Sequence, residues 1–555
     1  MYIEIISKKR SGRVHKCILL RESFREGTRV KHRTLANLTG KSEEEIAAIK
    51  FALKHKGNLP VNFEVEKLES NQGLSVGAVI ALREVAKKLG IVQSLGRSAQ
   101  GSLALWQILA RIIRRGSRLG AVRLAQTHAA CDVLGMDAFN EDELYHNLDW
   151  LSERQAKIEK TLFKLKNKPR VNLFLYDVTS SYLEGECNEY GDYGYNRDRK
   201  RGKLQIVIGL LTDAEGDPVS VQVFQGNTSD NTTVVEQVHK VIDRFGVKHT
   251  IFVGDRGMLK EPQLKEIEEF SDHITALTAA QIRTLIKKGI VHLDMFKNEI
   301  HTVRCQGIRY ILRRNPFRQQ EIANKRDAKR RTIEELLSKQ NNYLAGSTRR
   351  KIETAVKMVN VKIKKLGAQK WLTISTKGRC LTLHTNEEIL KKESELDGCY
   401  VIKTNVPESS EAKSAAIHDR YKDLIFVEWA FRTEKSLLEI RPIFLRLASR
   451  TEGHVFVVML AYKIIRYLAL AWKEIGVTIE EGIAELDSIC LCEIKPANSL
   501  PIQIIPKPRP LAQKLLDALA VDLPQTIQNR GITITPRKKL SRPPSKRGAN
   551  PQRDE

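Results

Sequence analysis

Two aspartates stand where two buried strands are predicted to end. Asp177 follows VNLFLY (171–176) and Asp255 follows TIFVG (250–254), both short apolar runs typical of strands covered on both faces. If these strands lie side by side and parallel, about 4.8 Å apart, both carboxylates leave the same edge of the sheet and can share metal ions roughly 3.5 to 4 Å apart. That geometry suits phosphoryl transfer. Taken singly, either aspartate is more commonly a turn cap, so the hypothesis depends on the pair.

Oxygen ligands of this kind favour Mg²⁺, with Mn²⁺ as a substitute, over zinc. The eight cysteines include no Cys-x-x-Cys pair, and Cys490 and Cys492 lack partner ligands at metal-site spacing. His128, His146 and His454 also show no ligand spacing, and we interpret them as structural.

A third carboxylate is expected on a helix, and the segment YKDLIFVEWAFRTEKSLLEIRPIF (421–444) offers Glu428, Glu434 and Glu439. One face of this helix would gather four charged residues at i, i+4, i+7 and i+11: Glu428, Arg432, Lys435 and Glu439. Hydrophobic neighbours would form the packed faces: Phe426, Trp429, Ala430, Leu437 and Leu438. Glu428 therefore has cationic neighbours suited to DNA phosphate. The alternative is an i,i+4 salt bridge with Arg432 on a solvated helix.

This combination resembles the insertion-sequence DDE transposases, whose third motif runs Tyr, two residues, Arg, three residues, Glu, six residues, Lys. Tyr421, Glu428 and Lys435 fall at these offsets, whereas Leu424 occupies the arginine position. The departure leaves open which arginine contacts DNA, and Arg432, one turn beyond the glutamate, is the candidate substitute.

The resemblance covers about residues 171–472. QGNTSDN (225–231) looks like the family's polar loop, and TEGHVFVVML (451–460) looks like its C-terminal helix. The resemblance implies a ribonuclease-H-like fold with a domain inserted between the second aspartate and the glutamate. The long stretch of chain from Asp255 to Glu428 fits such an insertion, because a connection within a sheet needs far fewer residues.

The resemblance also implies the chemistry. Asp177, Asp255 and Glu428 would hold two metal ions, one activating water to nick DNA and the other stabilising the leaving 3′ oxygen. The freed 3′-OH would then attack a target phosphodiester, with no covalent protein intermediate. Tyr421 and Lys435 would grip the phosphates beside the cleavage site.

The chain between and after the aspartates predicts the scaffold of an α/β protein. Strands QIVIGLL (205–211) and VSVQVF (219–224) can pair as a hairpin through the turn DAEGD (213–217), and VSVQVF alternates like a more exposed strand. Helices are predicted at TTVVEQVHKVIDRF and KEPQLKEIEEF, with a last strand near HITAL. The order β-β-β-α-β-α-β matches a ribonuclease-H-like mixed sheet flanked by helices.

Other segments predict further domains. Near the start, YIEIIS and VHKCILL are predicted strands, followed by a helix that the capping box of Ser42 and Glu45 opens. The expected insertion combines strand-like HTVRCQ and IRYILR, a basic helical region from Pro316 to Leu366, and the strands WLTIST and CLTLHT. The expected divisions are a small basic module (1–70), an α-helical region that binds DNA ends (71–168), a catalytic domain (169–282 and 396–475), an insertion domain (283–395), a C-terminal region proposed for dimerisation (476–536) and a basic disordered tail (537–555).

The net charge of +27, from 93 Lys and Arg against 66 Asp and Glu, favours a polyanionic partner, and nucleic acid is the first candidate. A membrane surface is the competing partner, but neither end of the chain supplies a basic amphipathic helix or a lipidation signal. The most apolar stretch, HVFVVMLAYKIIRYLALAW, carries Lys463 and Arg466 in its middle, so it predicts a buried helix. With no secretory signal, we expect a cytoplasmic protein on the bacterial nucleoid.

Several basic clusters are candidates for DNA contact. The segment YGDYGYNRDRKRGK (190–203) mixes Tyr190, Tyr193 and Tyr195 with cations at Arg197, Arg199, Lys200, Arg201 and Lys203. An ordinary solvated hairpin tip explains it equally well. Arg256 follows the second aspartate, and the helical region carries Arg111, Arg114, Arg115, Arg118 and Arg123. A solvated helical face is the alternative for each of these arginines.

The leading hypothesis is an active DNA transposase that acts on terminal inverted repeats and target DNA, as a homodimer on paired ends. An inactive DNA-binding derivative is the rival, and a nuclease on the same fold is the third. The intact set of three carboxylates argues against the inactive derivative.

Overall fold

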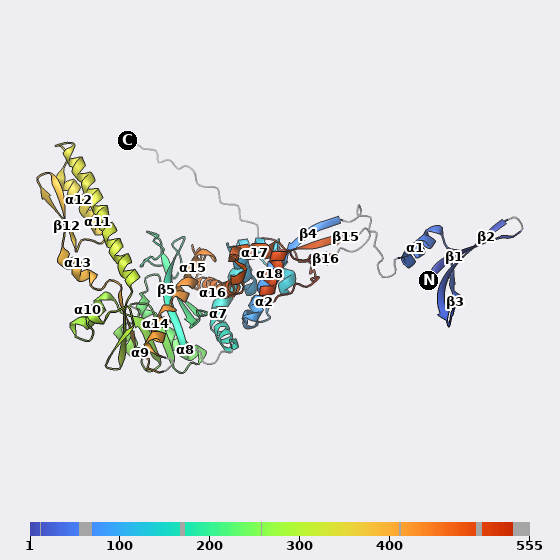
Figure 1. Cartoon of the computed structure of the whole chain (residues 1–555), viewed down its shortest axis with the longest axis horizontal. Coiled ribbons are helices and arrows are strands. Elements are labelled where there is room, and N and C mark those ends of the chain that lie inside the picture. The colour runs from blue at the N-terminus through green and yellow to red at the C-terminus, as the bar shows by residue number, and fades with distance from the viewer. Residues whose placement is uncertain are drawn as a thin grey trace, which may run out of the picture. The chain divides into compact units, whose positions relative to one another are not determined.

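The computed structural model describes residues 1–10, 13–54, 69–166, 172–256, 258–409, 412–495 and 502–536. The chain divides into two compact units, one formed by 1–72 with 492–503 and the other by 73–491 with 504–555 (Figure 1). The tail 537–555, which we predicted to be disordered, lies outside the described residues.

The first unit contains an antiparallel sheet of β1 (Tyr2–Arg10), β2 (Arg13–Glu26) and β3 (Arg29–Asn37), followed by α1 (Glu43–Lys54). The predicted capping box is confirmed: the Glu45 N–H donates to Ser42 Oγ at 3.2 Å, and the Ser42 N–H donates to Glu45 Oε2 at 2.9 Å. Sequence analysis missed β3, because all nine of its residues are exposed and no apolar alternation marks it.

The second unit begins with helices. Their bounds are α2 (Gly77–Lys88), α3 (Ile91–Leu95), α4 (Ala99–Ile113), α5 (Arg118–Ala125), α6 (Ala130–Leu134) and α7 (Glu141–Leu165). The helical periodicity after residue 75 predicted this region correctly. Its buried residues belong to the same hydrophobic core as one face of the main sheet, so these helices do not form a core of their own.

The main sheet has the order β10-β11-β14-β9-β8-β5-β6-β7, and β8 runs parallel to both β5 and β9. The strands are β5 (Leu173–Tyr182), β6 (Gln205–Asp213), β7 (Pro218–Phe224), β8 (Thr250–Gly254), β9 (Ser271–Ala276), β10 (His301–Cys305), β11 (Ile308–Arg314) and β14 (Cys399–Thr404). The connecting helices are α8 (Val234–Phe245) and α9 (Glu261–Ile267). The predicted mixed α/β sheet, the β6–β7 hairpin and the β-β-β-α-β-α-β order are confirmed.

Two expectations about these strands are wrong. β7 is mostly buried although its sequence alternates, because α7 and α16 (Ala448–Ala471) pack against it. β10 and β11, which we expected within the insertion, pair with β14 and extend the main sheet. Strand pairing between segments this far apart in sequence leaves no local signal.

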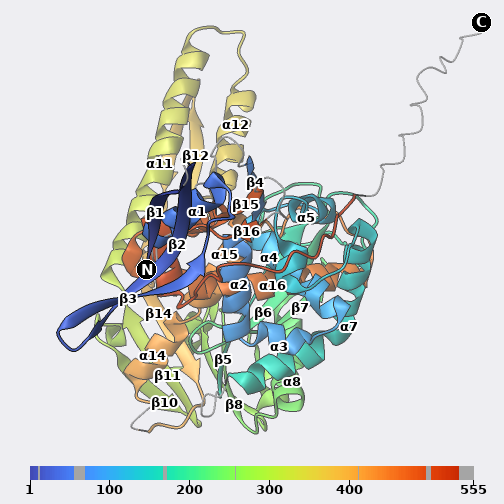
Figure 2. The same cartoon turned by 90° about the vertical axis from the view of Figure 1, so that its right-hand side faces the viewer.

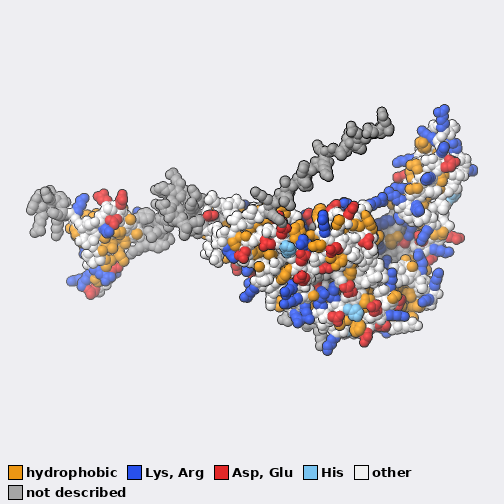
Figure 3. Space-filling view, turned by 180° about the vertical axis from the view of Figure 1, so that it is seen from behind, with side chains coloured by type: hydrophobic (Ala, Val, Ile, Leu, Met, Phe, Trp, Pro, Cys, Tyr) orange, Lys and Arg blue, Asp and Glu red, His pale blue; other side chains and the backbone are white. Residues whose placement is uncertain are grey.

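The remaining inserted segment is largely helical and has its own hydrophobic core, in which Trp371 is buried. Its elements are α11 (Pro316–Ala345), α12 (Ile352–Lys365), β12 (Leu372–Lys377), β13 (Cys380–Thr385) and α13 (Glu387–Ser394). The preceding helix α10 (Ala279–Lys287) instead packs through Ile282 against β11 and β14 of the main sheet. Within the second unit, α11 and α12 project as a hairpin away from the main sheet (Figure 2). Lys and Arg side chains gather along this projection (Figure 3).

The C-terminal part supplies α14 (Ser414–Lys422), α15 (Ile425–Ser436), α17 (Ile479–Asp487) and α18 (Pro510–Ala518) in addition to α16. Within the described residues, α16 alone is long and apolar enough to span a membrane, but 72% of its most apolar window is buried inside the protein. The Lys463 ammonium donates to Asp217 Oδ2 at 2.8 Å, so the predicted buried helix is confirmed. Helix α16 packs on α4, α7, α15 and β7 and joins the helical region to the sheet.

The close approach of α16 to α7 depends on Gly453, where an added Cβ would lie 2.2 Å from the Leu148 carbonyl oxygen. We expect Gly453→Ala to lower the free energy of unfolding by about 1 to 3 kcal/mol, because the two helices must move apart. Denaturant unfolding measures this change. Gly120→Ala on α5 is the control, since its Cβ meets only Ser117 Oγ at 3.7 Å. Equal stability of the two variants would contradict the tight contact.

Candidate active site

The register of β5 against β8 brings the two predicted aspartates together. Tyr176 pairs with Gly254 at the end of the parallel ladder, so Asp177 and Asp255 each follow the last paired residue. We had expected the strand to end at Asp177, but it does not. β5 continues to Tyr182 because β6 pairs with it along its whole length. The edge shared by the two aspartates therefore arises where β8 ends, not where β5 ends.

Asp177 is partly buried and accepts the Val178 N–H at 2.8 Å. Burial raises its pKa to about 7. The nearby Asp255 and Asp230 raise the pKa too, whereas the Val178 N–H and Arg197 lower it. Asp177 and Asp255 repel each other when both are ionised, so a cation would be stabilised between them.

Tyr421 contacts the second aspartate. Its hydroxyl donates to Asp255 Oδ1 at 3.3 Å from the last turn of α14. Burial raises the pKa of Tyr421, and the negative charge of Asp255 adds to the effect. The phenol therefore stays protonated and remains a donor at neutral pH.

Lys435 lies on the side of the first aspartate. Its ammonium donates to Thr179 Oγ1 at 2.7 Å and to Asp198 Oδ1 at 2.9 Å. Thr179 is two residues from Asp177, so both side chains leave the same face of β5. Burial and the nearby Arg197 lower the pKa of Lys435 to about 8, while the charges of Glu434 and Asp177 oppose this shift.

Glu428 precedes Lys435 by two helical turns, so the two residues share a face of α15. Glu428 is exposed, and within the described chain its side chain has no hydrogen bond or ion pair, not even with Arg432. Among the described residues, no three His, Cys, Asp or Glu side chains stand close enough to hold one metal ion. The structure thus brings Asp177 and Asp255 together but leaves Glu428 outside that pair.

The other faces of α15 differ from expectation. Phe426 and Trp429, predicted to be packed, are 37% and 59% exposed. Glu434 is the buried acid of this helix: it is 2% exposed, and its Oε1 has no hydrogen-bond partner in the described part of the structure. Burial raises the pKa of Glu434 to about 8. It interacts with Tyr462 of α16 and therefore faces the core.

Several cations in the connection between β5 and β6 already have partners within the protein, although the sequence predicted that they were available to DNA. Arg197 pairs with both Asp230 oxygens, at 2.7 and 2.6 Å, and Lys203 pairs with Glu184 at 2.6 Å. Lys200 lies 5.6 Å from the centre of the Tyr182 ring. Arg199 and Arg201 are exposed, as are Tyr193 and Tyr195.

Asp198, in the same connection, is a site residue that sequence analysis missed. Its side chain is 2% exposed and binds both Lys435 and Arg441. The available signal was one acidic residue within a run of cations, and that pattern alone does not predict burial.

A cavity of about 500 Å³ lies beside Asp255 and has basic side chains in its wall. Arg256, Arg318 and Lys422 contribute the positive charge, and Tyr421 lines it as well. The cavity can therefore accept an anionic ligand next to the paired aspartates.

Comparison with known proteins identifies the class. Residues 169–464, more than half of the chain, match the family described as the transposase DDE domain. Residues 3–60 match the N-terminal domain of IS1634 family transposases. The chain therefore belongs to the insertion-sequence DDE transposases, as the resemblance implied. DDE transposase domains depend on divalent metal ions and act on DNA.

No curated protein matches the chain in sequence. A solved piggyBac transposase synaptic complex with hairpin DNA is similar over 69% of both chains, at 8% identity and a TM-score of 0.36.

Glu434 is buried and Glu428 is exposed, so the two glutamates should differ in how they affect the pH dependence of stability. Because the folded carboxyl of Glu434 keeps its proton up to about pH 8, the native state binds more protons than the unfolded state between about pH 4.5 and 8. The contribution of Glu434 to stability therefore falls as pH rises through this range. We expect Glu434→Gln to remove this slope and to stabilise the fold at pH 8 by up to a few kcal/mol.

The exposed Glu428→Gln is the matched control on the same helix, with an expected change within about 0.5 kcal/mol. Denaturant unfolding at several pH values measures both variants. A Glu434→Gln protein that keeps the wild-type slope of stability against pH would contradict the prediction, and so would one that is less stable than the wild type at pH 8. Either result would show that a neighbouring group stabilises the ionised carboxylate of Glu434.

Proposed function

We propose that this transposase cleaves the ends of its element and transfers them to target DNA with Asp177, Asp255 and Glu428 as metal ligands. The metal is Mg²⁺, and Mn²⁺ substitutes for it. The observation that carries the proposal is the β5–β8 register, which sets two carboxylates side by side within reach of Tyr421 and Lys435.

The residues fit a divalent cation. The paired aspartates offer only hard oxygen ligands, and a cation relieves the repulsion that helps keep the pKa of Asp177 high. Glu428 is an exposed carboxylate without a partner among the described residues, so no existing ion pair must break before it can bind. Held by Asp177, Asp255 and Glu428, two divalent ions would supply activation of the attacking hydroxyl and stabilisation of the leaving 3′ oxygen.

The chain's own residues hold these groups and the DNA. The Tyr421 hydroxyl orients the Asp255 carboxylate. Lys435 lies beside Asp177 and is available to a phosphate oxygen once it leaves Asp198. Arg256 and the basic cavity beside it receive the DNA backbone.

Other predicted DNA contacts take separate roles. The exposed cations suited to the backbone are Arg199, Arg201 and Arg432, with Lys200 beside them. Arg197 and Lys203 are already paired with acids, so we assign them to shaping the β5–β6 connection. We further propose that the protein works in the bacterial cytoplasm as a homodimer, because cleavage of two ends requires two active sites.

Labelled DNA bearing the inverted repeats that flank the gene tests the proposal in the presence of Mg²⁺. We expect strand transfer by the wild type, and a loss of about a thousandfold or more in Asp177→Asn, Asp255→Asn and Glu428→Gln. DNA binding should persist in all three variants, since phosphate contacts supply most of the affinity.

Glu434→Gln is the matched control for Glu428→Gln and should stay active. An active Glu428→Gln beside an inactive Glu434→Gln would reverse the assignment. Cleavage without joining would indicate the nuclease, and binding without any cleavage would indicate the inactive derivative.

A further inference from the structure

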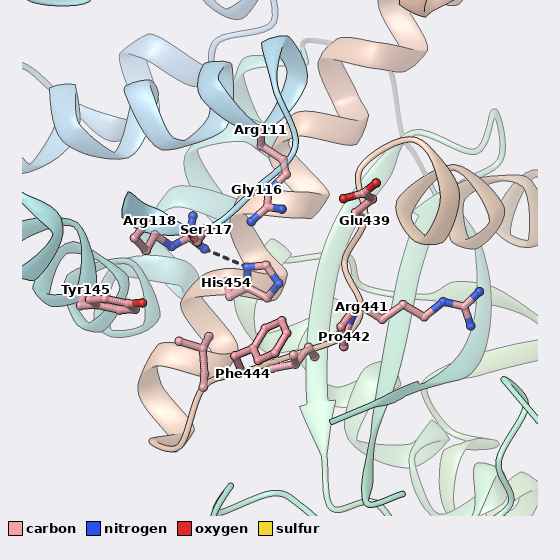
Figure 4. A pocket seen from close by; sticks show the side chains of 12 residues that line it. Arg111, Gly116, Ser117, Arg118, Tyr145, Glu439, Arg441, Pro442, Phe444 and His454 are labelled. Atoms are coloured by element: carbon pink, nitrogen blue, oxygen red, sulfur yellow. Dashed lines mark hydrogen bonds between the residues drawn. The ribbon is translucent and has the colours of Figure 1, made fainter. Parts of the chain in front are cut away.

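A second pocket lies apart from the paired aspartates, where the helical region meets the connection between α15 and α16 (Figure 4). Its volume is about 200 Å³. The helical side contributes Arg111, Arg118 and Tyr145, and the other wall contributes Glu439, Phe444 and His454. None of the proposed metal ligands lines this pocket.

Two buried arginines dominate the pocket. Arg111, near the end of α4, is 7% exposed, and Arg118, at the start of α5, is 5% exposed. Arg118 donates to His454 Nδ1 at 2.8 Å. Arg111 has no hydrogen bond or ion pair to any described residue.

His454 cannot neutralise this charge. Its Nε2 lies 3.2 Å from the Ile440 carbonyl oxygen, which accepts only an N–H, so Nδ1 is left as the acceptor for Arg118. Burial and the two arginines hold the pKa of His454 well below its usual range. The imidazole is therefore neutral and serves to orient Arg118.

The acidic residue of the pocket is also insufficient. Glu439 interacts with Arg115 at 3.5 Å, and its side chain is 49% exposed. Burial lowers the pKa of Arg111 to about 10 and that of Arg118 to about 9, so both remain charged at neutral pH. The charge of Glu439 favours the charged form of Arg111, but Glu439 is shared with Arg115, and among the described residues no acid pairs with Arg118. The two buried cations are therefore costly unless a further anion joins them.

Phosphate is the anion that fits. Guanidinium groups match phosphate oxygens through paired N–H donors. One water occupies about 30 Å³ of liquid, so the cavity has room for a phosphate group with several waters. A carboxylate ligand would use less of the donor set than two guanidinium groups offer.

We propose that this pocket binds a backbone phosphate of DNA between Arg111 and Arg118. The identity of the ligand as DNA rests on the proposed function, whereas the affinity for phosphate does not. Because α4, α5 and the α15–α16 connection all form the pocket, a phosphate here ties the DNA to the helical region and to the catalytic domain together.

Binding of the full chain to the inverted-repeat duplex, measured without divalent metal across a range of salt, tests the proposal. We expect Arg111→Gln and Arg118→Gln each to weaken binding about tenfold and to reduce the salt slope by about one. Both variants should unfold at the same temperature as the wild type or higher, because each loses a buried cation. Arg154→Gln, at an exposed arginine of α7 outside the predicted DNA contacts, is the control for lost charge and should change binding less.

Inorganic phosphate provides the second arm. At matched ionic strength it should raise the unfolding temperature of the wild type relative to chloride, and Arg111→Gln should abolish that rise. If phosphate stabilises the wild type while the arginine variants bind DNA as tightly as the wild type does, that combination would assign the pocket to a free oxyanion and overturn the proposal. Variants that unfold early would show a structural role and overturn it too. A wild type that binds DNA but transfers no strand would refute the proposed function and leave this inference standing.

Discussion

Parallel pairing of β5 with β8 sets the carboxyl groups of Asp177 and Asp255 next to each other, and neighbouring elements of the second unit hold them there. The ladder ends at Tyr176 and Gly254, so the next residue on each strand carries a carboxylate. β6 fixes β5 beyond that point, and Tyr421 holds the Asp255 carboxylate from α14. This arrangement supports the proposed cation site, because burial of Asp177 leaves its carboxylate less screened by solvent.

One face of helix α15 lies beside the paired aspartates, and another face packs into the hydrophobic core. Val427, Phe431 and Glu434 are buried, whereas Lys435 reaches Thr179 and Asp198. Since helical faces repeat at 3.6 residues per turn, the same rotation that buries Glu434 turns Glu428 toward the side of Lys435. Helix α16 fixes this rotation by packing on α15, β7 and the N-terminal helices at once.

The sequence predicted what depends on local pattern. Apolar runs located the strands around Asp177 and Asp255, and helical spacing placed Glu428 and Lys435 on one face. Features set by distant contacts were missed. β10 and β11 join the sheet through β14, β3 carries no apolar alternation, and Trp429 is 59% exposed although its spacing predicted a packed face.

The same limit applies to the charged residues. Asp198, Arg111 and Arg118 all occur among cations, where the sequence predicts solvent exposure, yet the fold buries all three side chains. Burial gives these residues roles that composition does not reveal. An ion pair keeps Asp198 against Lys435, and the two arginines share a pocket whose acidic residue, Glu439, also interacts with Arg115.

Metal-directed cleavage of the polypeptide tests the central claim most directly. Fe²⁺ bound in place of Mg²⁺, with ascorbate and peroxide, cuts the chain beside its ligands. The account predicts cuts near residues 177, 255 and 428 in the DNA complex, all suppressed by excess Mg²⁺. Cuts near 177 and 255 with none near 428, or with one near 434 instead, would contradict the assignment of the third ligand.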